Sequence, residues 1–161
     1  MTRYRIGNGF DAHRLVDGRP LMLGGVLVPF ARGLEGHSDG DCVLHALCDA
    51  LLGAAGEGDM GHHFPSADPR WKGAASALFV TEVAKRLAAH GWELENADLT
   101  VVAQQPPIAP HAPAMREAIA GALGAAPDRI SIKAKSTDGL GAFGRGEGIA
   151  ALASVLLRRE A

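Results

Sequence analysis

A carboxylate and an imidazole lie close together near the beginning of the sequence, in the run Asp11-Ala12-His13. Side chains two residues apart on an extended strand project from the same face, so both groups would face one partner. Such a pair can bind a metal ion. An accidental pair of surface side chains explains this run equally well, so its interpretation depends on other residues.

A second group of polar side chains follows in a segment with helical spacing. Asp41, His45 and Asp49 recur every four residues, which places them within roughly 80° of one another on a helix. The opposite side carries the apolar residues Val43, Leu44, Leu47 and Leu51. A solvated helix face would explain this polar stripe. The alternative is that His45 joins Asp11 and His13 in a zinc site that leaves one position open, with Asp49 fixing the tautomer of a ligand histidine.

The third segment is residues 133–148 (KAKSTDGLGAFGRGEG), where small residues, hydroxyls, a carboxylate and glycines follow an expected strand. Backbone N–H groups in such a loop can approach a phosphate closely, although many glycine-rich loops are only turns. The run lacks the spacing of a P-loop. Arg145 and Glu147 could form a structural ion pair. A metal site together with a phosphate-binding loop indicates phosphoryl chemistry.

The sequence has no H-E-x-x-H motif and no Cys with a plausible His partner at a known spacing. Cys42 and Cys48 do not match ligand positions, and we interpret them as small residues that fill the core. The remaining histidines outside the candidate site are interpreted as surface or loop residues: His62, His63, His90 and His111.

Composition predicts one globular domain over residues 1–161. Hydrophobic residues make up 47% and charged residues 21%, a balance that argues against disorder. The formal net charge of −2 argues against nucleic acid as a partner, because the chain has no concentrated basic face. No segment approaches the roughly 18 apolar residues of a membrane span, so we expect no membrane partner. The N-terminal residues show no signal-peptide core, and we expect a cytoplasmic protein.

The periodicity of apolar residues predicts an alternation of strands and helices, of the α/β or α+β class. Strands are expected over residues 2–11, 21–30 (with a turn or bulge at Gly24-Gly25), 98–104, 129–136 and 149–157. The last strand is either fully buried or packed in a subunit interface. Helices are expected over residues 38–52, capped by Ser38 or Asp39 and ended by Gly53, 74–90, ended by Gly91, and 112–123.

Three blocks of the sequence resemble one known family over essentially the whole chain. The blocks are RIGNGFDAHRL, HSDGDCVLHALCDALLGAAGEGDMGHHFP and GRGEGIA. They are similar to the 2-C-methyl-D-erythritol 2,4-cyclodiphosphate synthases, phosphorus–oxygen lyases of the non-mevalonate isoprenoid pathway. The resemblance places Asp11, His13 and His45 on the metal, as the spacing had suggested independently.

The resemblance implies an α+β fold with a mixed sheet and helices packed on one face. It also implies a homotrimer around a central β-rich axis, with active sites between neighbouring subunits. The implied reaction takes 4-diphosphocytidyl-2-C-methyl-D-erythritol 2-phosphate to the cyclic diphosphate and CMP. The 2-phosphate of the substrate itself attacks the β-phosphorus, so the protein supplies no nucleophile.

The resemblance also implies the roles of individual residues. Zn²⁺ would be held by Asp11, His13 and His45, and a second divalent ion, Mg²⁺ or Mn²⁺, by Asp138. His37 and Ser136 would stabilise the transition state. The methylerythritol part would contact Ser38, Asp59, Met60, Gly61, Phe64, Pro65, Ser66, Ala67 and Asp68. The cytidine and phosphates would contact Ala103, Gln104, Gln105, Pro106, Pro107, Ile108, Ala109, Ala134, Lys135, Thr137, Ala142 and Arg145, with Glu147 and Asp49 supporting the site from behind.

Several positions depart from the pattern of the family. Asp138 stands where a Glu is usual, and Pro107 occupies a position often held by Lys. Lys135-Ser136-Thr137 replaces a run of threonines, and Lys135 adds a charge there. Ser66 replaces a common Asp, and Ala142-Phe143 inverts the usual aromatic-then-small order. None of these changes affects the three expected zinc ligands.

Two other functions remain open at this point. A zinc-dependent phosphohydrolase would use the same metal ligands, but with a metal-bound water as the attacking group. A non-catalytic trimer that binds nucleotides or isoprenoid phosphates would keep the segments 103–109 and 135–145, but it would not need an intact Asp11, His13 and His45 set. The intact set favours the enzyme.

Overall fold

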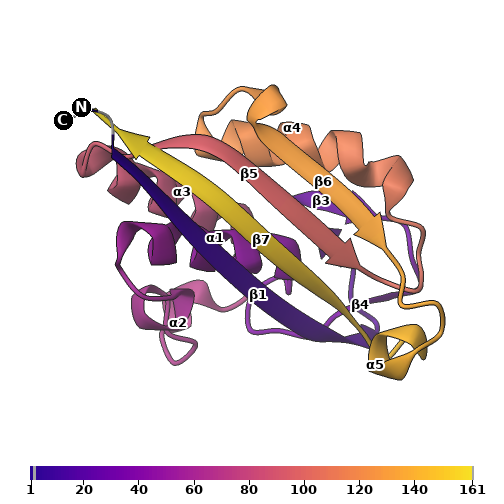
Figure 1. Ribbon diagram of the computed structural model, residues 1–161. Coiled ribbons are helices and arrows are strands. Elements are labelled where there is room, and N and C mark those ends of the chain that lie inside the picture. Colours follow the sequence, from indigo (N-terminus) through magenta and orange to yellow (C-terminus); the bar gives the residue numbers. More distant parts are fainter. Residues whose placement is uncertain (2, 161) are drawn as a thin grey trace.

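The computed structural model describes Met1 and residues 3–160, so positions 2 and 161 of the expected domain lie outside it. Figure 1 shows the elements, whose bounds are β1 Arg3–Asp17, β2 Leu21–Leu23, β3 Val26–Val28, β4 Arg32–Leu34, α1 Cys42–Ala55, α2 Met60–His63, α3 Ser76–Ala89, β5 Glu93–Val102, α4 Ala112–Leu123, β6 Ile130–Lys135, α5 Gly141–Gly144 and β7 Gly148–Arg159. Within these residues, no helix has the length and apolar character of a membrane span.

A mixed sheet with the strand order β4-β1-β7-β5-β6 forms the centre of the fold. β7 is antiparallel to both β1 and β5, whereas β5 and β6 run parallel. Figure 1 shows α1, α3 and α4 together behind the sheet, with the opposite face left open. The expected α+β class with a mixed sheet and helices is therefore confirmed.

The long apolar strand β7 is buried on one side only. Ala151, Ala153, Val155 and Leu157 belong to the core, whereas the intervening Leu152 keeps 47% of its surface exposed. Of the two interpretations from the sequence, a fully buried strand is therefore wrong. Tyr4, Ile6 and Phe10 of the neighbouring β1 are also more than half exposed. Together with Leu152, these residues make an apolar face on the open side of the sheet, which we call the open sheet face.

Helix α1 packs directly on β1 because β1 presents glycines at the contact. A Cβ atom added to Gly9 would lie 1.8 Å from the Ala46 carbonyl oxygen, and one added to Gly7 would lie 2.0 Å from that of Ala50. Neither position can hold a side chain while the helix stays in place. Gly7, Gly9, Asp11 and His13 alternate along β1 onto the same face, so the close contact leads directly to the two polar residues.

Helix α1 is buried on nearly all sides, and its buried residues extend well beyond the apolar stripe that the sequence predicted. Its buried residues are Cys42, Val43, Leu44, Ala46, Leu47, Cys48, Ala50, Leu51, Leu52 and Ala54. Both cysteines are free and fully buried, in line with their interpretation as core-filling residues. Burial also raises the pKa of both thiols, which keeps them protonated and unreactive.

The ends of α1 differ from the expectation. The N-cap is Asp41, whose side chain accepts a hydrogen bond from the Leu44 N–H, so the predicted caps Ser38 and Asp39 are wrong. The helix runs through Gly53 and ends at Gly56, which adopts the left-handed conformation with φ 80°. Gly53 meets no neighbouring atom within 4 Å and is simply an exposed helical residue.

The strand bounds also shift. β1 continues six residues beyond the expected end, and β5 begins at Glu93 rather than Asp98. The turn expected at Gly24-Gly25 is confirmed, with φ values of 59° and 77°, and it divides residues 21–30 into the hairpin β2–β3. α4 has the predicted bounds, and α3 and β6 agree to within two residues.

Gly9→Ala tests the close contact between α1 and β1. We expect it to destabilise the protein by roughly 3 kcal/mol, because the new methyl group must push the Ala46 backbone away. The matched control is Gly53→Ala, which should stabilise the protein by about 1 kcal/mol because it adds an open-space methyl group to an exposed helix position. Urea unfolding measures both. Equal effects of the two substitutions would contradict the packing described.

Candidate metal centre and pocket

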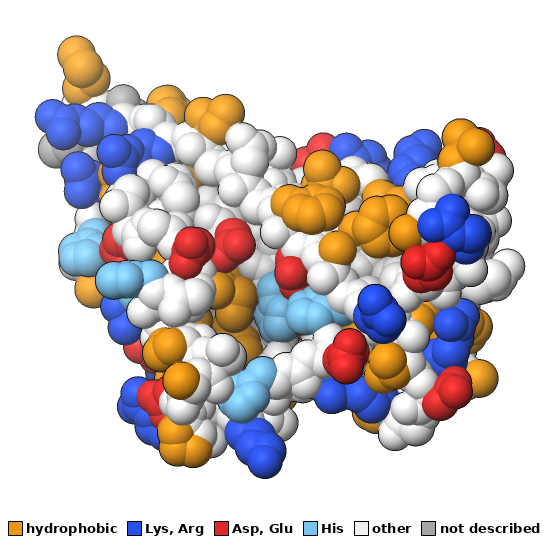
Figure 2. All heavy atoms as spheres, turned by 90° about the horizontal axis from the view of Figure 1, so that it is seen from below, with side chains coloured by type: hydrophobic (Ala, Val, Ile, Leu, Met, Phe, Trp, Pro, Cys, Tyr) orange, Lys and Arg blue, Asp and Glu red, His pale blue; other side chains and the backbone are white. Residues whose placement is uncertain are grey.

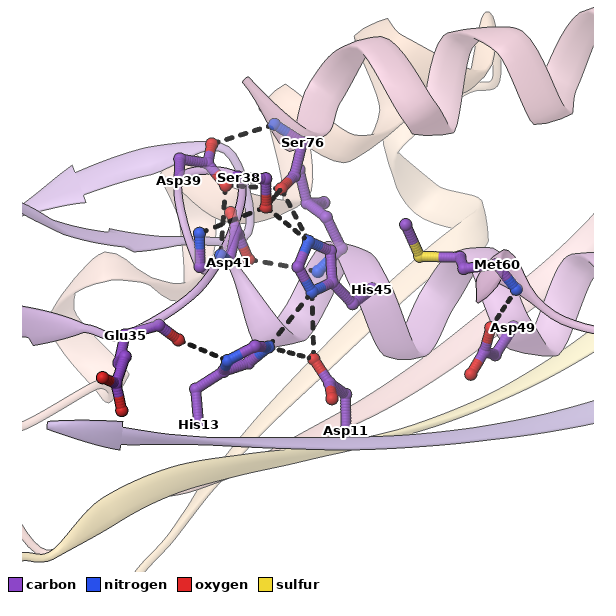
Figure 3. Close-up of polar contacts among 12 residues, drawn as sticks. Asp11, His13, Glu35, Ser38, Asp39, Asp41, His45, Asp49, Met60 and Ser76 are labelled. Atoms are coloured by element: carbon purple, nitrogen blue, oxygen red, sulfur yellow. Dashed lines mark hydrogen bonds and ion pairs between the residues drawn. The ribbon is translucent and has the colours of Figure 1, made fainter. Parts of the chain in front are cut away.

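Asp11, His13 and His45 converge on one point (Figure 3). Asp11 Oδ2 lies 2.8 Å from His13 Nε2 and 3.0 Å from His45 Nδ1. The two imidazole nitrogens are 3.3 Å apart. All three side chains are mostly buried, with exposed fractions of 26%, 22% and 14%. One carboxylate oxygen and two ring nitrogens therefore form a triangle that opens on one side.

Two elements bring these residues together. Asp11 and His13 lie on the face of β1 that meets α1, and His45 stands in the first turn of α1, where its N–H donates to the Asp41 carbonyl. The Asp41 carboxylate is fully buried and accepts hydrogen bonds from the N–H groups of Gly24 and Gly25 as well as Leu44. Asp41 thus fixes the start of α1 against the β2–β3 turn. It does not belong to a polar stripe with His45, and that part of the expectation is wrong.

The geometry of the triangle suits a divalent metal ion. Ligand atoms about 2.1 Å from a tetrahedral zinc ion lie about 3.4 Å from one another, slightly more than the 2.8–3.3 Å found here. The second nitrogen of each ring also has a polar partner: His13 Nδ1 lies 2.5 Å from the Glu35 carbonyl oxygen, and His45 Nε2 lies 2.9 Å from Ser76 Oγ. Such partners are typical of metal-binding histidines, because they direct the free lone pair of the ring toward the ion.

The charges within the group are strongly coupled. Burial acts to raise the pKa of Asp11, but hydrogen bonds from His13 and His45 outweigh it and hold this pKa well below its usual range. The hydrogen bond to Asp11 is the main reason why the pKa of His13 lies above 6.5. Without a metal, a proton on His13 therefore takes part in holding the triangle together.

A pocket of about 280 Å³ opens beside this group. Figure 2 shows a group of histidine side chains near the middle of this face, with an acidic side chain beside it. Of the residues expected at the site, the pocket is lined by Asp11, His13, His37, Ser38, His45, Asp49, Met60, Gly61, Phe64 and Ser66. Its apolar wall includes Trp71 and Phe79, whose ring centroids are 5.4 Å apart. Their place at the pocket could not be predicted from sequence spacing, because Trp71 lies in a short turn and Phe79 in α3.

Asp49 lines the pocket, but its hydrogen bond goes to the Met60 N–H at 2.8 Å (Figure 3). Asp49 therefore holds the start of α2 over the pocket. The role expected from the sequence, fixing the tautomer of a ligand histidine, is not the one seen here. The burial of Asp49 raises its pKa. Asp59 caps α2 by accepting from the His62 N–H. Asp68 binds the exposed Arg70, with Oδ2 2.6 Å from Nη2, and together with Asp59, Pro65 and Ala67 it does not line the pocket.

The second group of expected site residues forms a separate cluster, which we call the β5–β6 edge: residues 103–109 and 134–139. The Ala103 N–H donates to the Lys135 carbonyl, and the Gly139 N–H donates to Gln104 Oε1 at 3.2 Å. Ser136 Oγ donates to Asp138 Oδ1 at 3.1 Å, and Asp138 adopts a left-handed backbone with φ 51°.

Parallel pairing of β5 and β6 explains this cluster, because the carboxyl ends of parallel strands meet at one edge (Figure 1). Ala103, Pro106 and Ile108 are buried there, whereas Gln105, Pro107 and Ala109 are exposed. None of these residues lines the pocket beside Asp11, so a single chain holds the expected site as two separate parts.

The residues expected at the far end of the loop lie on the surface. Ala142 is an exposed residue of α5. Arg145 Nε donates to Glu147 Oε1 at 2.6 Å, and both side chains are more than half exposed. Such an exposed pair contributes little to stability. Neither Arg145 nor Glu147 lines the pocket beside Asp11.

The affinity for Zn²⁺ should rise with pH. The metal needs an unprotonated His13 nitrogen, and this proton is held by Asp11 at a pKa above 6.5. Binding of Zn²⁺ should therefore tighten from about pH 6 until His13 is deprotonated, while the stability of the metal-free protein falls over the same interval. Titration against a chelator of known affinity at each pH measures this. Zn²⁺ binding that does not change over this interval would contradict the proton-linked triangle.

Comparisons of this chain with protein families, with other sequences and with solved structures all lead to one family. The family model described as the YgbB family matches residues 4–158. A 2-C-methyl-D-erythritol 2,4-cyclodiphosphate synthase from Moorella thermoacetica is 58% identical over 95% of this chain and 94% of its own. A solved structure of such a synthase in its CDP-bound form is 42% identical, with a TM-score of 0.87 over 95% of this chain and 99% of that one. The bifunctional IspDF of Campylobacter jejuni is 41% identical with a TM-score of 0.95, over 99% of this chain but only 43% of that longer chain. The chain belongs to the YgbB family.

Proposed function

We propose that the chain converts 4-diphosphocytidyl-2-C-methyl-D-erythritol 2-phosphate into 2-C-methyl-D-erythritol 2,4-cyclodiphosphate and CMP. The observation that carries this proposal is the Asp11, His13 and His45 triangle at the mouth of a pocket, in a chain of this family. The step joins a phosphate oxygen of the substrate to its β-phosphorus and breaks the bond to the CMP group. Because both reacting groups belong to one substrate, the protein needs to position them and stabilise charge.

The pocket beside the triangle is the metal half of the site. A Zn²⁺ ion held by Asp11, His13 and His45 would supply positive charge to a phosphate oxygen of the substrate. His37 and Ser38 stand at the same pocket and bind the polar part of the methylerythritol group, with His37 stabilising the transition state. The rings of Phe64, Trp71 and Phe79 exclude water from one side of the pocket.

The β5–β6 edge is the nucleotide half of the site. The backbone of residues 103–109 contacts the cytidine, and the turn from Lys135 to Asp138 contacts the phosphates, with Ser136 stabilising the transition state. Asp138 would hold a second divalent ion, Mg²⁺ or Mn²⁺, which would supply positive charge to the diphosphate. Its exposed carboxylate already accepts a hydrogen bond from Ser136, which keeps these two side chains together at the tip of the turn.

The two halves meet between neighbouring copies of the chain, in a homotrimer. This proposal rests on the separation of the halves in one chain and on the open sheet face, where Tyr4, Ile6, Phe10 and Leu152 expose apolar surface. Contiguous exposed apolar surface of this kind is typical of subunit interfaces. Cyclic symmetry would give each site the metal half of one copy and the nucleotide half of the next. We place the trimer in the cytoplasm.

A phosphorus NMR time course with the substrate, Zn²⁺ and Mg²⁺ tests the reaction. We expect CMP and a cyclic diphosphate in equal amounts, because the 2-phosphate is the attacking group. A phosphohydrolase would instead release CMP with a linear phosphate product, because water would attack. If the protein binds metal and nucleotide but yields no product, the alternative of a non-catalytic binding protein is supported.

Mixed trimers test whether the halves come from different copies. His45→Ala removes a metal ligand, and Ser136→Ala removes a hydroxyl of the nucleotide half, so each variant alone should lose most activity. In trimers co-expressed from both variants, about one quarter of the sites would combine two intact halves and recover that share of wild-type activity. The control is each variant co-expressed with itself. Mixed trimers no more active than the controls would contradict a shared site.

A further inference from the structure

The second nitrogen of His45 faces two buried hydroxyl groups rather than solvent. His45 Nε2 lies 2.9 Å from Ser76 Oγ and 3.1 Å from Ser38 Oγ. Ser76 is fully buried, and Ser38 keeps only 7% of its surface exposed. Figure 3 shows both hydroxyls on the side of the ring away from Asp11. The ring is therefore held between the metal ligands on one side and these serines on the other.

The proton of Ser76 is already committed to a different partner. Ser76 Oγ makes a short hydrogen bond to Asp39 Oδ1, in which the hydroxyl must donate because a carboxylate can only accept. The other oxygen of Asp39 accepts the backbone N–H of Ser76 at 2.9 Å, and Oδ1 also accepts the Asp41 N–H at 3.1 Å. Three donors therefore hold the Asp39 carboxylate in place. Only the lone pairs of Ser76 Oγ remain for His45.

It follows that His45 donates its Nε2–H to Ser76. With its Nε2 proton given to Ser76, the ring turns Nδ1 toward Asp11 Oδ2, 3.0 Å away in the triangle, so a metal ion bound there would take the place of the Nδ1 proton that otherwise bonds Asp11. A hydrogen bond from Ser76 to the ring in the opposite direction would require Ser76 to release Asp39. The direction of each bond in the chain from Asp39 to Ser76 to His45 is thus fixed by the acceptor-only carboxylate at its end.

We propose that Asp39 and Ser76 are positioning residues for the metal centre, which hold the His45 ring in the tautomer and orientation that direct Nδ1 to the ion. This inference rests on the proposed metal centre but not on the substrate. It assigns a role to a residue of α3 that no motif in the sequence marks. The same residues also have a purely structural contact, because the Ser76 N–H bonded to Asp39 caps the start of α3, where Ala75 provides no side-chain cap.

Ser76→Ala separates the two roles, because it removes the hydroxyl and keeps the backbone N–H that caps α3. We expect Zn²⁺ alone to bind about 10- to 100-fold more weakly, the usual effect of losing a partner behind a metal ligand. The metal-free variant should keep the fold and its cap of α3 but unfold at a somewhat lower urea concentration than the wild type, because a buried hydrogen bond is lost. In the Zn²⁺-loaded protein, the Nε2–H signal of His45 in proton NMR should exchange with solvent faster than in the wild type.

Ser154→Ala is the matched control, since Ser154 also bonds a side chain, Asn8, but lies on β7 away from the pocket. It should change neither Zn²⁺ affinity nor the His45 signal. If Ser76→Ala kept the wild-type Zn²⁺ affinity and the wild-type exchange rate of the His45 Nε2–H, the proposal would be overturned. It would also be overturned if Zn²⁺ affinity fell only in the double variant that carries Ser38→Ala as well. A wild-type protein that does not bind Zn²⁺ would contradict the metal centre itself, which distinguishes the two failures.

Discussion

The close approach of α1 to β1 is the contact on which the rest of the structure depends. Backbone meets backbone at Gly7 and Gly9, where a methyl group would lie within about 2 Å of a helix carbonyl oxygen. This contact places the first turn of α1 directly over the next residues of the same strand face, Asp11 and His13. If α1 and β1 were as far apart as a helix and a sheet usually are, His45 could not reach Asp11 and His13.

The metal centre therefore sits at the edge of the core, and its surroundings reflect this position. On one side, α1 is buried by apolar and small residues, so His45 cannot move without disturbing the packing. On the other side, a buried hydroxyl and carboxylate bind the His45 ring, and the Glu35 carbonyl binds the ring of His13. Asp49 connects the helix to the start of α2 above the pocket. Local packing and polar contacts thus act together to orient the ligand atoms.

Spacing made Asp11, His13 and His45 candidate ligands, the family resemblance favoured that interpretation over a solvated helix face, and the structure brings the three residues together. Spacing failed for Asp41, since the same four-residue spacing describes a helix cap turned into the core. Nothing local marks Ser76 or Trp71, which reach the site through tertiary packing. The strand order and the separation of the β5–β6 edge from the pocket also could not be predicted, because they depend on pairing between distant segments.

Anomalous diffraction at the zinc absorption edge, from crystals grown with Zn²⁺, would locate the metal ion. We expect a single strong peak beside the pocket, bonded to Asp11 Oδ2, His13 Nε2 and His45 Nδ1 at distances of about 2.0–2.2 Å. A peak at another group of side chains, or one bonded to His45 through Nε2, would contradict this set of ligand atoms.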